Sequence, residues 1–139
     1  MPLTSEVRVK FSALQTGAND AGTPTFKPVI DKVLALASGT GADQADLLFT
    51  DHRIVNASSN DDIDLAGVLV SALGGVITNA ELVALLIIAD TANVSNLTIG
   101  GGSNPFVGFL GGTTPTVGPI RPGGIFLLAS PDAAGIGAV

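Results

Sequence analysis

The sequence predicts a mainly β fold, an antiparallel sandwich similar to a jelly roll, with one short α-helix. Three observations lead to this class. Glycine and proline occur 18 and 8 times and mark many turns. Hydrophobic residues make up 46% of the 139 residues, which is too apolar for a disordered chain. Short apolar segments recur between the turns, as the strands of a sandwich do.

The length predicts a single β-rich domain over residues 1–139. Within it we expect an N-terminal strand and loop over 1–25, a helix over 26–38 and sandwich strands over 44–139. The boundaries follow the points at which the hydrophobic period and the turn signals change.

The N-terminal strand is predicted from strict alternation in Ser5–Leu14. Val7, Val9 and Phe11 fall on one face, and charged residues fall on the other. Thr16–Thr25 is rich in turn-forming residues and is expected to be a loop.

The helix is predicted from a change of period. Phe26, Ile30, Val33, Leu34 and Ala37 share a helical stripe, Pro28 suits the first turn, and Gly39-Thr40-Gly41 supplies a stop.

Further strands are expected downstream, at spacings that suit a sandwich. Glu81–Ala89 suits a buried strand, with a short core helix as the alternative. The tail from Pro131 begins another apolar segment, so we expect an edge that another subunit or further chain would cover. The other segments expected to be extended are 46–55, 63–69, 96–100, 105–110 and 124–130.

Composition and charge exclude several function classes. Charged residues are only 13%, about half the usual share, and the net charge is −6. An acidic chain without a basic stripe does not suit nucleic acid or an anionic membrane surface. The chain has no cysteine, tyrosine or tryptophan, which excludes thiolate chemistry and disfavours a glycan- or receptor-binding module. No signal peptide or apolar membrane span is recognised.

Candidate catalytic residues are few. His52 is the only histidine, and it lacks a second histidine for zinc and a nucleophile motif. In an extended segment Asp51 and Arg53 would face away from it. The acidic group Asp61, Asp62 and Asp64 lacks the spacing of a calcium loop and is expected to be a solvated turn. The glycine runs do not match phosphate-binding motifs. We therefore predict no catalytic, cofactor-binding or metal site.

Arg121 is the only basic residue after Arg53. It could pair with an acidic group inside the fold or across a subunit boundary, and the sequence does not choose between these.

Several stretches together resemble small virion structural proteins of tailed bacteriophages and prophages. They are SEVRVKFSA at the start, LASGTGADQADLLFTDHRIV, DDIDLAGVLVSALGGVITNAELVALLIIA, and the later SNPFVGFLGG and IRPGGIFLLASPDAAG. The resemblance spans nearly the whole chain and implies a shared fold without an active site. Similar proteins continue beyond the Pro-Asp-Ala-Ala turn.

The resemblance and the composition lead to one expected function. We expect a non-enzymatic capsid decoration (cement) protein, with a tail, baseplate or fibre component as the alternative. Its partners would be copies of itself, for example in a trimer, and other virion proteins such as the major capsid protein. It would be located in the virion after assembly in the host bacterial cytoplasm. The second class of function is an enzyme, for example a hydrolase with an acidic pair drawn from Asp51, Asp61, Asp62 and Asp64, and it is disfavoured. A receptor- or glycan-binding module is the third class.

Overall fold

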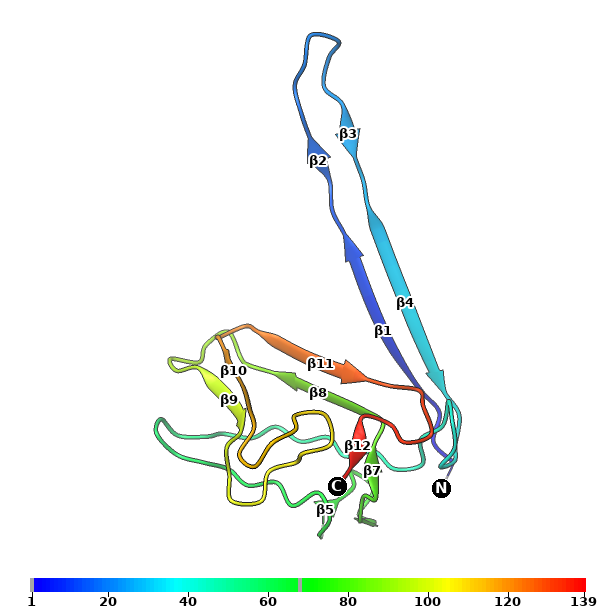
Figure 1. The fold of residues 1–139 in the computed structure, drawn as a ribbon, viewed down its shortest axis with the longest axis vertical. Coiled ribbons are helices and arrows are strands. Elements are labelled where there is room, and N and C mark those ends of the chain that lie inside the picture. Colours follow the sequence, from blue (N-terminus) through cyan, green and yellow to red (C-terminus); the bar gives the residue numbers. More distant parts are fainter. Residues whose placement is uncertain (1, 68) are drawn as a thin grey trace.

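The computed structural model describes residues 2–67 and 69–139, and in this part of the chain every regular element is a β-strand. The strands form six small antiparallel sheets of two strands each. A β-rich antiparallel fold is therefore confirmed. A sandwich of two facing sheets is not shown in the described part of the chain. Five of the six sheets belong to two hairpin systems, and the β5–β6 sheet lies between these systems in the sequence (Figure 1).

The first system is a long, regular hairpin, which we call the arm (residues 5–36). Strand β1 (Ser5–Ser12) pairs with β4 (Val29–Leu36), and β2 (Gln15–Thr16) pairs with β3 (Thr25–Phe26). The same register continues without a slip to the Asn19↔Gly22 bridge at the tip. Each side thus spans about 15 residues, which at about 3.4 Å per residue gives a ribbon about 50 Å long. Figure 1 shows it projecting from the rest of the chain.

The helix predicted over 26–38 is wrong, because this segment contains β3 and β4. Ile30, Leu34 and Leu36 lie on one face of the ladder and Val29, Val33 and Ala35 on the other. Each face also carries one charged residue, Lys32 on the first and Asp31 on the second. The sequence therefore does not show the alternation of apolar and polar residues that identifies a strand. The β-branched residues favour a strand once β1 is available as a partner. The predicted strand at Ser5–Leu14 is confirmed, and the expected loop over 16–25 is the end of the same hairpin.

The second system, residues 81–138, is a nested set of antiparallel pairs, which we call the body. From outside to inside, β7 (Glu81–Leu82) pairs with β12 (Gly137–Ala138), β8 (Ala84–Ile88) with β11 (Ile125–Ala129), and β9 (Leu97–Gly100) with β10 (Thr116–Ile120). The strand alternative for Glu81–Ala89 is confirmed, as are strands within 96–100 and 124–130. The tail pairs with β7 through β12, and the other edge of this two-stranded sheet has no strand partner among the described residues.

Between the two systems lie residues 37–80, and the regular structure described there is one small hairpin, β5 (Leu69–Val70) with β6 (Val76–Ile77). Its turn is closed by the Gly74 amide, which donates to the Ser71 carbonyl at 2.9 Å. The strands predicted at 46–55 and 105–110 are wrong, because both segments are irregular. Of the extended segment predicted at 63–69, Val68 lies outside the described residues and only Leu69 is in a strand.

The core is thin for a chain of this composition. Among the described residues only four hydrophobic side chains are buried, namely Leu36, Ile77, Ala89 and Ile136, and none of the larger side chains is completely enclosed. Twenty-one large hydrophobic residues are exposed in the same part of the chain. The apolar content predicted a filled interior, whereas this chain leaves much of its apolar surface outside.

Two glycines fix how the C-terminal strand closes on the body. A Cβ atom built on Gly137, which has φ of 139°, would lie 2.3 Å from the Gly108 Cα. We expect Gly137→Ala to destabilise the chain by about 2 kcal/mol, because the backbone must shift and adopt a strained conformation. Gly102→Ala is the control, since nothing lies within 4 Å of that position. Thermal unfolding followed by circular dichroism measures both, and equal midpoints for the two variants would contradict the close contact.

Candidate functional site

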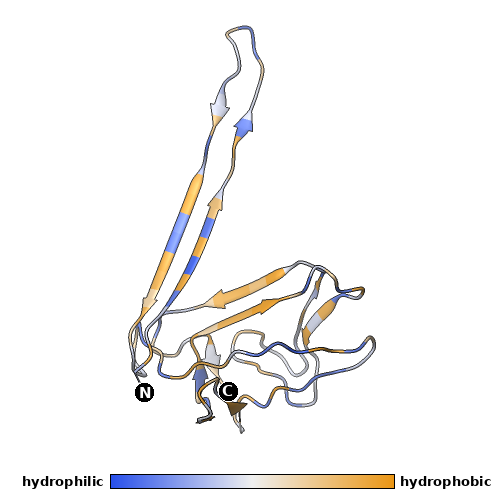
Figure 2. Ribbon diagram, turned by 180° about the vertical axis from the view of Figure 1, so that it is seen from behind, coloured by the Kyte–Doolittle hydropathy of each residue, from blue (hydrophilic) through white to orange (hydrophobic). Residues whose placement is uncertain are grey.

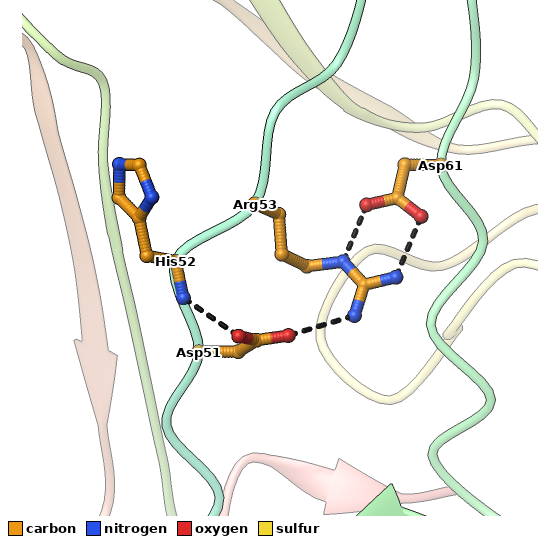
Figure 3. A network of polar contacts seen from close by, with 4 residues as sticks. All are labelled: Asp51, His52, Arg53 and Asp61. Atoms are coloured by element: carbon orange, nitrogen blue, oxygen red, sulfur yellow. Dashed lines mark hydrogen bonds and ion pairs between the residues drawn. The ribbon is translucent and has the colours of Figure 1, made fainter.

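The first candidate site is a polar network in the irregular segment after the arm (Figure 3). The Arg53 guanidinium donates to both carboxylate oxygens of Asp61, through Nε and, at 2.7 Å, through Nη2. Its Nη1 donates to Asp51 Oδ2 at 3.0 Å. The other oxygen of Asp51 accepts the His52 backbone amide at 2.8 Å. One arginine therefore joins two loop segments through two carboxylates.

The other residues considered for catalysis do not join this network. The His52 imidazole points away from the Arg53–Asp61 pair, as Figure 3 shows, while Asp51 and Arg53 share the opposite side as expected. Asp62 and Asp64 are exposed, and neither lines the hollow of about 510 Å³ beside the network. In the described part of the chain, no three acidic, histidine or cysteine side chains are grouped as a metal site would require.

The charges within the network largely offset one another. Two carboxylates already satisfy the guanidinium, so the cluster has no free positive charge for an anionic ligand. The hydrogen bonds from Arg53 lower the pKa of Asp61. Since the folded pKa lies below the unfolded one, the pair stabilises the loop fully above the unfolded pKa. This contribution is lost as the pH falls through the lower, folded pKa.

We expect Asp61→Asn to remove the ion pair that joins the two loop segments, leaving Arg53 paired with Asp51 alone, and to make the bond after Arg53 several-fold more sensitive to trypsin at pH 8. The adjacent Asp62→Asn is the matched control, because Asp62 makes no ion pair in the described structure. Peptide mapping of short digests measures the cleavage rate after Arg53. Equal rates in the two variants would show that the pair does not order the loop.

The second candidate site is one face of the arm. Residues paired directly across the two strands lie on the same face. The pairs Val7↔Leu34, Val9↔Lys32 and Phe11↔Ile30 therefore form one continuous surface, which we call the apolar arm face. Lys32 is its only charged member, and Val9, Phe11 and Ile30 are exposed.

The opposite face, here called the polar arm face, carries Glu6, Lys10 and an ion pair in which Arg8 donates to Asp31 at 2.9 and 2.5 Å. It also carries the apolar residues Val29, Val33 and Ala35 of β4 between these charges. The arm is thus a two-sided ribbon. An isolated two-stranded hairpin is at best marginally stable in water, and exposed apolar faces of this kind are common at the interaction sites of proteins.

A third apolar surface lies on strands β8 and β11, which Figure 2 colours as hydrophobic along their length. The pairs on the outer side, here called the body face, are all apolar: Ile125↔Ile88, Leu127↔Leu86 and Ala129↔Ala84. Ile88 and Ile125 are 63% and 68% exposed. The inner side is different, because the Phe126 ring stacks on Phe109 at a centroid distance of 5.9 Å.

The apolar arm face and the body face meet at an open groove of about 430 Å³. Val7, Val9, Lys32 and Leu34 line it from the arm, and Leu127 and Ala129 line it from β11. Beyond this groove the arm leaves the body, so that the two faces diverge from a common base (Figure 1). The sequence predicted the apolar side of β1 but not this arrangement, because β4 was expected to be helical.

Arg121 forms no ion pair with any described residue. Pairing inside the fold, one of the two alternatives left open by the sequence, is therefore not seen in the described structure. Its backbone carbonyl accepts the Gly124 amide at 2.8 Å in the turn before β11.

Comparison with known proteins finds no match for this chain, whether with protein-family models, with curated proteins or with solved structures. In the described residues, no helix has the length and apolar character needed to span a membrane.

Proposed function

We propose that this protein is a non-enzymatic structural subunit of a tailed-bacteriophage particle, most simply a capsid decoration protein. It associates with copies of itself and with the shell by burying apolar strand surfaces. It is made in the cytoplasm of the host bacterium and located in the virion. Assembly is supported by the large apolar surface that one chain leaves uncovered. Location on a phage particle is supported by the sequence resemblance.

The accessible surface of the chain is large for its mass. The chain exposes 9704 Å² at a mass of 13.8 kDa. A compact monomer of that mass exposes about 6,600 Å², so this chain exposes about 3,100 Å² more. One subunit contributes roughly 1,000–2,500 Å² or more to a permanent interface, so the excess is large enough to supply such interfaces. Together with the thin core, it supports a chain that completes its packing in an assembly.

A subunit of this kind suits a particle that needs many identical contacts. Each contact can be modest, because many copies on one shell combine into durable binding. The sandwich expected from the sequence fits the same proposal, since two-stranded sheets from different chains can supply its two layers. A tail, baseplate or fibre subunit is the alternative, and the long arm would serve equally well to reach neighbours there.

The test is the copy number of the protein in purified phage particles, measured by quantitative mass spectrometry against the major shell protein. A number on the scale of the shell protein supports the decoration role. A number far below it moves the protein to the tail or to a vertex and overturns the decoration role. Absence from the particles overturns the virion assignment altogether.

A further inference from the structure

The apolar arm face and the body face are complementary in chemistry and in shape. Each is the surface of a two-stranded antiparallel ribbon and carries six residues. Four of the arm residues and two of the body residues already line the groove within one chain, which leaves Phe11 and Ile30 on the arm and Ala84, Leu86, Ile88 and Ile125 on the body for another molecule. Eleven of these twelve residues are apolar, with Lys32 the exception. Two such surfaces pack as the layers of a β-sandwich, about 10 Å apart.

The arm cannot cover the body face of its own chain along its whole length. The two share only the groove at the base, and the middle and tip of the arm stand clear of the body (Figure 1). Phe11 and Ile30 lie beyond the residues that line this groove and are 56% and 63% exposed. The outer end of the body face, at Ile88 and Ile125, is exposed as well. A second molecule is needed to cover both.

Charge distribution points to a second copy of this chain as that molecule. The arm (residues 5–36) holds four of the six basic residues and three of the twelve acidic ones, for a net charge of +1. The body (residues 81–138), which carries the docking surface, holds one basic and three acidic residues, for a net charge of −2. The arm and the body of another copy therefore carry opposite net charges, which favours the orientation in which the arm meets the body.

We propose that the arm of one copy lays its apolar face on the body face of a second copy, and that the two ribbons form an intermolecular β-sandwich. This inference rests on the proposed structural function and names the partner and the surfaces. The polar arm face, with the Arg8–Asp31 pair and Lys10, remains toward solvent. Burial of the two faces accounts for part of the uncovered surface, and it leaves the rest for contacts with the particle.

Cross-linking between two separately labelled chains tests the contact, and the absence of native cysteine makes it specific. One chain carries Ile30→Cys on the arm and the other carries Leu86→Cys on β8. Because packed sheets are about 10 Å apart, a short bis-maleimide suits the gap better than a disulfide, which needs Cα atoms within about 7 Å. The two chains are mixed, treated with the reagent and separated on a denaturing gel.

The matched control replaces Ile30→Cys by Val29→Cys, which is next in sequence and equally exposed, at 61%, but lies on the polar face. We expect the Ile30 mixture to give at least about tenfold more covalent dimer than the Val29 mixture. Equal yields, or no dimer from either mixture while light scattering shows an oligomer, would overturn the docking but leave the proposed function standing. If the protein had the mass of a single chain in solution and were absent from phage particles, both the docking and the proposed function would be overturned.

Discussion

Replacing Ile30 by Asp is expected to dissociate the oligomer, with at least about a hundredfold rise in the dissociation constant. The carboxylate would have to be buried between two apolar faces without a partner, which costs about 3 kcal/mol or more. The arm itself should still form, since Ile30 is exposed in the single chain. Sedimentation velocity over a range of concentrations measures the dissociation constant.

Val29→Asp provides the control for this experiment. Val29 precedes Ile30 on β4 and has almost the same exposure, but it lies on the polar face opposite Ser12. We expect association to be nearly unchanged in this variant. If both substitutions weakened association equally, the loss would come from the stability of the arm, and the apolar arm face would not be the contact surface.

Substituting neighbouring residues on β11 is expected to separate folding from assembly. Phe126 lies on the inner side of the strand and stacks on Phe109. Phe126→Asp removes this packing and places a charge inside the body, at a cost of about 3–5 kcal/mol. That is a large part of the stability of a typical domain, so we expect the variant to unfold.

Leu127, the next residue, lies on the body face and lines the groove. We expect Leu127→Asp to keep its β-sheet content and to lose association. Far-UV circular dichroism reports the fold, and light scattering reports the mass, of both variants. We have placed Phe126 on the inner side of β11 and Leu127 on the body face. This placement would be contradicted if the Leu127→Asp variant still associated, or if the Phe126→Asp variant were as stable as the native chain.

The fold could be predicted from the sequence where one strand face is apolar and the other polar. Ser5–Leu14 shows this alternation, and β1 was predicted correctly. The segment Val29–Leu36 has apolar residues on both faces and one charge on each, so a helical stripe fits it equally well. Only pairing with β1 determines that this segment is a strand and not a helix. This contact is far away in the sequence and leaves no local signal.

The pairing of β7 with β12 was missed for a similar reason. It joins Glu81–Leu82 to Gly137–Ala138 across more than 50 residues, and two-residue strands have no periodicity to recognise. The irregular segments 46–55 and 105–110 were mistaken for strands because their apolar residues were assumed to fill a core. Leu47, Leu48, Ile54 and Val107 are instead exposed.

The polar network was partly visible in the sequence. The spacing of Asp51 and Arg53 indicated a shared side, which the structure confirms. The contribution of Asp61 could not be derived, because it depends on how the turn between them folds back. The opposite charges on either side of this polar turn were the one available signal for an ion pair.

The mass of the intact chain in solution, measured by light scattering after size exclusion, tests most directly whether this protein works by assembly. We predict a mass that is a multiple of 13.8 kDa, independent of added metal. A mass of one chain at every concentration that can be reached would contradict the account, because the apolar arm face and the body face would then remain uncovered.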